Sequence, residues 1–244
     1  MRSFHNILSF KSPYLYILIG IIFLILSGIF HPFDMEYKNA LQQIANSHEK
    51  WTILNIIKVI GKGEFLVYVA LILGVVRYKA LACRLLLAFL IASVIIWSLK
   101  ISVHRERPNH RNYLSFPSGD SGTSACMVAS VSSQIPIVAI PGAVVVGAVA
   151  FLRNYDNYHY LSDVLAGIGF GVISAGLSMF VKLRRFKIFW KIKPFAFKGL
   201  YGVLFLVYLL PPLFNWAFIF WLICGVLLIA SSSLKKKKKY DNAC

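Results

Sequence analysis

The sequence predicts an all-α fold, a polytopic bundle of membrane helices. Of its 244 residues, 58% are hydrophobic and only 14% are charged, and the mean hydropathy is +0.70. About a quarter of the residues in an ordinary soluble domain are charged. So few charged side chains cannot cover a soluble core of this size. The composition therefore excludes a soluble globular domain, a disordered chain and a disulfide-stabilised secreted scaffold.

Eight apolar runs are long enough, or nearly long enough, to cross a bilayer as helices, which takes about 20 residues. They cover residues 14–31, 63–77, 83–99, 121–135, 137–152, 162–181, 197–211 and 214–231. Pro136 and Pro141 bracket the break between the fourth and fifth runs, because proline removes a helix hydrogen-bond donor. The second run is short and the fourth is rich in serine and glycine. We expect both to be buried against other helices.

Basic residues set the predicted topology, since Lys and Arg concentrate in cytoplasmic loops. Clusters lie at the N-terminus, in residues 77–84, in residues 182–196 and in the tail from Lys235 to Lys239. Placing all of them in the cytoplasm puts both termini inside and gives an even number of spans. Residues 32–62, 100–120, 153–161 and 212–213 then face outwards. Because the basic residues alternate with apolar runs, the formal net charge of +17 indicates membrane topology and not a nucleic-acid partner.

Three segments at the outer boundary hold most of the ionisable residues that lie outside the cytoplasmic loops. They run from Lys100 to Pro108, from Pro117 to Asp120 and from Arg153 to Asp163. Polar residues at this depth are costly and usually functional. Residues 100–111 alone carry four basic side chains on the side that the topology rule predicts to be poor in them. An anion site would explain this exception; an inverted topology or snorkelling side chains are the alternatives.

The cations of these segments suit a phosphoryl group in transfer, whose negative charge spreads over its oxygens. Lys100, Arg107 and Arg153 are the candidate phosphate clamp, because an ammonium supplies a point charge and each guanidinium a planar fork. Ser118 and the backbone N–H groups of Gly119 and Asp120 precede or open a predicted helix. There they would add donors at a site where the helix dipole favours an anion.

His159 is the candidate nucleophile, and Asp163 is the residue expected to orient it. A four-residue offset places both side chains on one face of a helix. The Asp163 carboxylate can then hold Nδ1–H, which leaves Nε2 free to attack phosphorus and stabilises the positive ring that results.

The order and spacing of these motifs, K-x6-R-P, then P-S-G, then R-x5-H-x3-D, resemble the type 2 phosphatidic acid phosphatase (PAP2) family over roughly residues 60–182. The resemblance implies a six-helix core, with the last two spans as additions. It also implies an integral-membrane phosphatase in which histidine is phosphorylated and water then releases phosphate, without metal or cofactor. His159, Asp163 and Asp120 would be too few ligands for a metal site. The cysteines lack metal-ligand spacing and are expected to be inert; they are Cys83, Cys126, Cys224 and Cys244.

Two positions depart from the family pattern, which normally has histidine in place of Asp120 and serine in place of Leu152. That histidine protonates the leaving oxygen in the family. We expect Asp120 at the helix N-cap, where an aspartate near cations is stabilised as its anion and is a poor acid at neutral pH. Asp120 could act directly, could orient a water or a nearby histidine as the proton source, or could serve as a plain cap. The candidate histidines are His104 and His110.

The missing serine hydroxyl at Leu152 removes one donor near the phosphate. Tighter binding by Arg105 or Arg111 would compensate, although each is equally consistent with a charge that faces solvent or headgroups.

Weak protonation favours a substrate whose leaving group needs little help. A phosphate monoester leaves more readily than an alcohol, because its second pKa is about 6, and the anomeric oxygen of a sugar is intermediate. We therefore expect undecaprenyl diphosphate or the 1-phosphate of lipid A in preference to phosphatidic acid or phosphatidylglycerophosphate. A lipid phosphotransferase of the same family and a catalytically impaired lipid-binding relative are the alternatives.

These predictions divide the chain into four parts. Residues 1–13 form a cytoplasmic N-terminus, and residues 14–182 form the catalytic membrane domain. Residues 183–231 hold a basic loop and two further spans, and residues 232–244 form a polylysine tail that meets anionic headgroups. Residues 48–62 are predicted to form an interfacial amphipathic helix. The expected location is the inner, cytoplasmic membrane, with the active site on the periplasmic face and membrane lipids as the partners.

Overall fold

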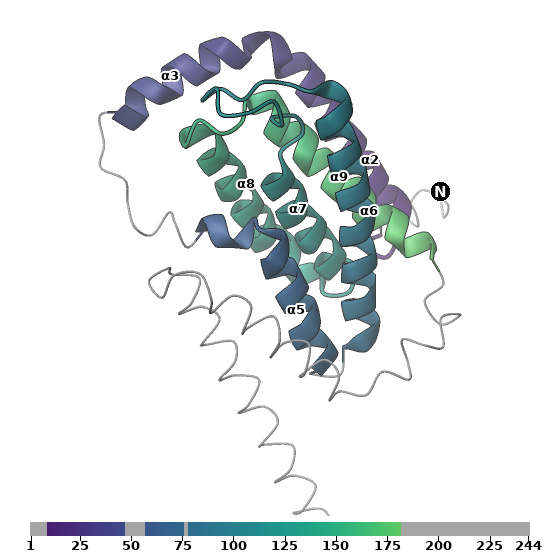
Figure 1. Cartoon of the computed structure of the whole chain (residues 1–244). Helices are drawn as coiled ribbons and strands as arrows, with labels where there is room; N and C mark the ends of the chain where they lie inside the picture. Colours follow the sequence, from purple (N-terminus) through teal and green to yellow (C-terminus); the bar gives the residue numbers. More distant parts are fainter. Residues whose placement is uncertain (1–8, 47–56, 76–77, 182–244) are drawn as a thin grey trace, which may run out of the picture.

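A computed structural model describes residues 9–46, 57–75 and 78–181 of the chain, and in these residues every regular element is a helix. The elements in chain order are α2 (Pro13–Phe30), η1 (His31–Phe33), α3 (Asp34–Asn46), α5 (Gly63–Val75), α6 (Lys79–Val103), α7 (Gly119–Ser132), η2 (Pro136–Val138), α8 (Ala139–Tyr155) and α9 (Leu161–Phe180). The predicted all-α helix bundle is therefore confirmed (Figure 1).

The first six predicted spans correspond to α2, α5, α6, α7, α8 and α9. Four helical segments in the described part of the chain are long and apolar enough to cross a membrane: Pro13–Ala45, Lys79–Val103, Pro136–Tyr155 and Leu161–Phe180. Gly63–Gly74 is a shorter apolar helix. The last two predicted spans, the lysine tail and most of the predicted amphipathic helix 48–62 lie outside the described residues.

Helix α3 was not predicted, because its residues are mostly polar and show no membrane-spanning run. It begins at Asp34 and has Glu36 in its first turn. Acidic side chains at this end of a helix are stabilised by the helix dipole. In Figure 1, α3 lies across one end of the bundle and does not run along the other helices.

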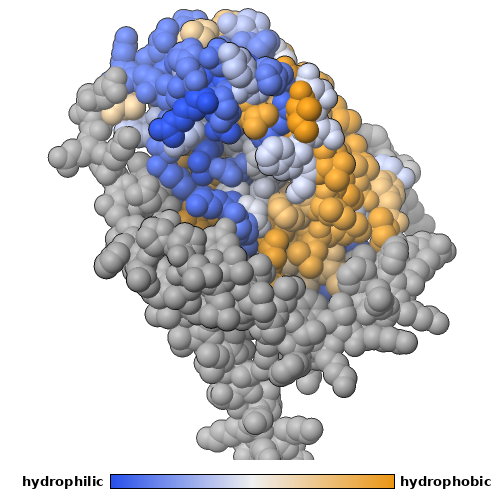
Figure 2. Space-filling model, viewed as in Figure 1, coloured by the Kyte–Doolittle hydropathy of each residue, from blue (hydrophilic) through white to orange (hydrophobic). Residues whose placement is uncertain are grey.

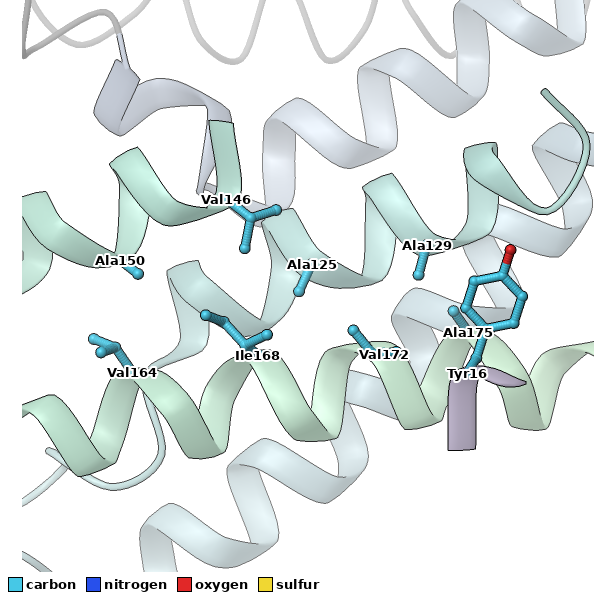
Figure 3. Packing of buried hydrophobic residues seen from close by; sticks show 9 residues of the cluster. All are labelled: Tyr16, Ala125, Ala129, Val146, Ala150, Val164, Ile168, Val172 and Ala175. Atoms are coloured by element: carbon cyan, nitrogen blue, oxygen red, sulfur yellow. The ribbon is translucent and has the colours of Figure 1, made fainter. Parts of the chain in front are cut away.

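Helix α9 lies at the centre of the bundle and packs against α2, α6 and α7. A hydrophobic cluster joins it to α2, α7 and α8 (Figure 3). Its members are Tyr16, Ala125, Ala129, Val146, Ala150, Val164, Ile168, Val172 and Ala175. A second cluster joins α5, α6 and α7 around Leu66, Leu85 and Ile96. The predicted burial of the fourth run is confirmed, since most of α7 is buried.

Glycines set the close approach of α7 and α9. A Cβ on Gly171 would overlap the backbone oxygen of Gly122, and a Cβ on Gly167 would overlap the backbone oxygen of Ser118. Small residues permit such contacts between membrane helices, where packing and not hydrophobicity drives association. This contact fixes the N-terminal end of α7 against α9.

Exposed apolar side chains cover the outer faces of α2 and α6, including Leu18, Ile25, Leu90, Val94 and Trp97. In Figure 2, hydrophobic residues form one side of the molecule, and hydrophilic residues gather at the end that carries α3. The ends of α6, α7, α8 and α9 that bear the three motifs meet at this hydrophilic end (Figure 1).

Gly171→Ala tests the contact between α7 and α9. We expect this variant to lose about 1–3 kcal/mol of stability, as overpacked cores do, because the backbone of Gly122 cannot move away. The measurement is thermal unfolding in detergent micelles. Gly147→Ala is the matched control, since a Cβ at Gly147 has nothing within 4 Å. Equal unfolding temperatures for the two variants would contradict the packing argument.

Candidate active site

A cavity of about 550 Å³ opens at the hydrophilic end of the bundle. Six of the eight predicted site residues line it, and they are Lys100, Arg107, Gly119, Asp120, Arg153 and His159. The two others, Ser118 and Asp163, are fully buried. Apolar side chains of α5 and α6 continue the walls, with Val67, Phe89, Ile96 and Trp97 among them. The cavity therefore joins a cationic end to an apolar wall.

The last turn of α6 and the loop that follows, residues 104–118, position two of the three clamp cations. Lys100 is buried, and its Nζ donates to the carbonyl oxygen of Leu114 at 2.7 Å. An ammonium has three donors, so this bond leaves two for a ligand. Arg107 donates from Nε to Oδ1 of Asn112 at 2.8 Å, and its backbone N–H donates to the carbonyl of the same residue. Both cations are thus held by the loop itself.

The third cation, Arg153, lies in the last turn of α8 and forms an ion pair with Asp120 across the cavity. The distance from its guanidinium nitrogen to Oδ2 of Asp120 is 2.8 Å. Asp120 is one-third exposed, and Arg153 is mostly buried. A bound anion would have to share Arg153 with this carboxylate.

The N-cap of α7 is Ser118, and this differs from the expectation that Asp120 occupies that position. Ser118 has extended backbone angles, and its hydroxyl accepts from the backbone N–H of Ser121. Asp120 is the second residue of the helix, so its carboxylate projects into the cavity instead of capping the backbone. The backbone N–H of Ser118 donates to the carbonyl of Asp163 at 2.9 Å, which ties α7 to α9.

His159 lies between α8 and α9, where Asn154 holds its carbonyl oxygen through a 2.9 Å hydrogen bond. Its Nδ1 lies 2.7 Å from the carbonyl oxygen of Ser115. Because a carbonyl can only accept, Nδ1 must carry the hydrogen. In the neutral imidazole, Nε2 then has a free lone pair. The side chain lines the cavity, so this nitrogen is the candidate nucleophile.

The carboxylate of Asp163 holds the imidazole less directly than the sequence predicted. Its Oδ2 lies 3.8 Å from Nδ1 of His159, too far for a hydrogen bond. The same oxygen accepts from the Ser115 hydroxyl at 2.5 Å and from the backbone N–H of Tyr160 at 2.9 Å. Ser115 therefore orients the ring through its carbonyl, and Asp163 orients Ser115 while supplying negative charge nearby.

Burial lowers the pKa of His159 below its ordinary value of 6.5. The positive charges of Lys100 and Arg107 act in the same direction, whereas Asp163 opposes them. The neutral ring, which is the nucleophilic form, is therefore favoured at neutral pH.

Two residues around the site, Ser115 and Asp34, were not assigned a role from the sequence, and a third, Arg105, has a different role from the one suggested. Ser115 supplies the carbonyl that fixes His159. Arg105, suggested as an additional clamp, does not line the cavity and pairs with Asp34 and Asp163 instead. Asp34 has no motif around it, and its only signal in the sequence is an acid shortly after an apolar run.

The other residues suggested as substitutes lie away from the cavity lining. The ring of His104 stacks on Tyr113, and His110 pairs with Glu106 at the surface. Arg111 is exposed and contacts Tyr158. Leu152 is a buried residue of the apolar interior.

The comparisons with known proteins agree with this geometry. Residues 81–187 match the family model described as the PAP2 superfamily. Over these residues the chain is similar to the PAP2 superfamily. The resemblance indicated by the three motifs is therefore confirmed, and the prediction of a phosphatase agrees with it. A search of curated proteins gives no match to the chain.

Two solved structures share the fold of this chain. One is LpxE from Aquifex aeolicus, with a TM-score of 0.53 and 20% identity over 61% of this chain and 96% of that one. The other is the first transmembrane PAP2-type phosphatidylglycerolphosphate phosphatase from Bacillus subtilis. Its TM-score is 0.55, with 24% identity over 74% of this chain and 98% of that one. The chain is thus a membrane protein with the PAP2-type fold.

The described residues contain no group of three or more His, Cys, Asp or Glu side chains that could hold a metal ion. The cavity instead presents cations, which suit a bound anion.

The ion pair between Asp120 and Arg153 predicts how the site binds a simple anion. In Asp120→Asn, Arg153 loses its competing carboxylate, so we expect inorganic phosphate to bind about fivefold more tightly, in the range of a partly exposed ion pair. Calorimetric titration of the purified protein measures this affinity. Glu106→Gln, which removes an exposed carboxylate outside the cavity lining, should leave the affinity unchanged. Weaker binding in Asp120→Asn would show that the carboxylate supports the anion instead of competing with it.

Proposed function

We propose that this protein is a membrane lipid phosphatase that works through a phosphohistidine intermediate on His159. The observation that carries the proposal is the position of His159. Its Nδ1 is bound to the Ser115 carbonyl, and its Nε2 remains available in a cavity with three cationic side chains. A nucleophile and an electrostatic clamp in one cavity are the two parts that phosphoryl transfer requires.

The reaction proceeds in two displacement steps. Lys100, Arg107 and Arg153 bind the phosphoryl oxygens, and Nε2 attacks phosphorus as the bond to the leaving oxygen breaks. The ring then carries a positive charge, which the buried carboxylate of Asp163 stabilises at 3.8 Å from Nδ1. Water attacks the phosphohistidine, inorganic phosphate leaves, and His159 returns to its neutral form.

The apolar wall of the cavity supports a lipid as the substrate. Val67 on α5 and Phe89, Ile96 and Trp97 on α6 continue directly from the cationic end. The lipid portion next to the phosphate would lie against these side chains. Pockets that combine an apolar lining with a few convergent polar groups are typical of such ligand sites.

The position of Asp120 affects which lipid phosphate we propose as the substrate. The Asp120 carboxylate is engaged by the Arg153 guanidinium, so it is not positioned to protonate a leaving oxygen. A substrate whose leaving group is itself a phosphate needs the least protonation, since its second pKa is about 6. The proposed substrates are therefore a lipid diphosphate such as undecaprenyl diphosphate, or an anomeric sugar phosphate such as the 1-phosphate of lipid A.

The proposed location is the cytoplasmic membrane, with both termini inside and the cavity on the periplasmic face. The distribution of basic residues along the sequence supports this orientation. The lipid would then be drawn from the outer leaflet.

A substrate panel on the purified chain tests the function. We expect phosphate release from undecaprenyl diphosphate or lipid A 1-phosphate to exceed release from phosphatidic acid and phosphatidylglycerophosphate about tenfold or more in kcat/KM, a difference of about 1.4 kcal/mol in activation free energy. His159→Ala should reduce turnover at least about 10³-fold, as expected when a nucleophile is removed. Preference for phosphatidic acid would overturn the substrate assignment. Unchanged turnover in His159→Ala would overturn the function.

The pH dependence of kcat/KM reports the protonation state of the free histidine. Protonation of Nε2 removes the nucleophile, so activity falls as the pH drops through the pKa of His159. Because burial lowers this pKa, we expect the acid limb below pH 6.5. The profile is measured with two substrates whose phosphates titrate at different pH values. A limb that stays at the same pH with both substrates belongs to the enzyme, and one that moves belongs to the substrate. An enzyme limb above pH 6.5 would contradict the prediction.

A further inference from the structure

Arg105 joins two buried carboxylates beside the candidate active site. One guanidinium nitrogen lies 2.7 Å from Oδ1 of Asp163, and another lies 2.8 Å from Oδ2 of Asp34. The side chains of Asp163 and Asp34 are 0% and 2% exposed, and that of Arg105 is 19% exposed. The guanidinium also lies 4.2 Å from the ring centroid of Tyr160. Two nitrogens of one guanidinium thus each bind a different carboxylate.

A buried carboxylate that loses its counter-ion is strongly destabilised. A guanidinium holds its donors in a fixed planar fork that suits two acids at once, whereas an ammonium is a compact point charge without this geometry. Asp34 is also held by Ser162, whose backbone N–H donates to Oδ1 at 2.9 Å, and by His31 at 3.1 Å. Arg105 is therefore fixed from both sides, by α3 and by the start of α9.

These contacts affect the position of His159 through Ser115. The Ser115 hydroxyl donates to Asp163, and its backbone N–H donates to the carbonyl oxygen of Arg105 at 2.9 Å. The Ser115 carbonyl accepts from Nδ1 of His159. Arg105 therefore holds Ser115 in two ways. Its carbonyl oxygen accepts from the Ser115 N–H, and its guanidinium binds the Asp163 carboxylate, which accepts from the Ser115 hydroxyl. Apart from His159 itself, none of the residues in these contacts lines the cavity.

We infer that Arg105 and Asp34 are positioning residues for the reaction, which act through Asp163 and Ser115 to hold the imidazole of His159 in line with the bound phosphate. This inference rests on the proposed function. It assigns a role to the N-terminal part of the chain, because Asp34 lies outside the residues that match the family model.

A kinetic double-mutant cycle on the full chain tests this inference. The variants are Arg105→Met, Asp163→Asn and the double variant, measured with the best substrate of the panel. We expect Arg105→Met to lower kcat about 100-fold, as for a displaced catalytic group, with KM within threefold of the original, about the scatter of distant substitutions. If Arg105 acts through Asp163, the double variant should be no slower than Asp163→Asn alone.

Further variants separate positioning from folding and from binding. Asp34→Asn should lower kcat about tenfold while the affinity for inorganic phosphate is retained. Arg105→Lys replaces Arg105→Met if the latter does not fold, and it should show the same loss of kcat because it cannot bridge both acids. Arg111→Met is the matched control, since this exposed arginine lies in the same loop outside the cavity lining, and its kcat should not change.

The outcomes are distinguishable. Multiplicative losses in the double variant, or a raised KM with unchanged kcat in Arg105→Met, would overturn the positioning role and leave the phosphatase function intact. Wild-type turnover that persists in His159→Ala would overturn the proposed function and this inference with it.

Discussion

The buried carboxylate of Asp163 is the constraint on which this end of the bundle depends. It is fully buried at the start of α9, where it accepts hydrogen bonds from Ser115, Tyr160 and Arg105. A charge in this position is tolerated only when its hydrogen-bonding capacity is satisfied. Ser115 and Arg105 belong to the loop of residues 104–118, and Tyr160 belongs to the turn before α9. Compensating one acid therefore fixes the α6–α7 loop, the turn before α9 and the imidazole together.

Helix packing supplies the rigidity that this arrangement needs. Glycines of α9 let the backbone of α7 approach closely, and the backbone N–H of Ser118 reaches the carbonyl of Asp163. The start of α7, which we propose binds phosphate, and the start of α9, just after His159, are consequently parts of one packed unit. Precise placement on helices is what a preorganised site requires.

The sequence predicted the helices and the convergence of the motifs well, because both depend on patterns that are local along the chain. Apolar runs indicate spans, and alternating directions bring Lys100, Ser118, Arg153 and His159 to one end. The details of the site depend on backbone paths that no motif encodes. Whether Nδ1 of His159 meets a carboxylate or a carbonyl is decided by the course of residues 104–118. The pairing of Arg105 with Asp34 joins residues 71 positions apart.

The short length of α7 has a consequence for the surrounding lipid. Its 14 residues span about 21 Å, whereas the 25 residues of α6 span about 37 Å. Ile137 in the turn that follows α7 and Ile140 at the start of α8 are 83% and 81% exposed. The segment that continues through α8, Pro136–Tyr155, is 20 residues long and apolar enough to cross a membrane. Helix α7 is too short to cross by itself, and its burial among the other helices spares it from matching the thickness of the surrounding lipid.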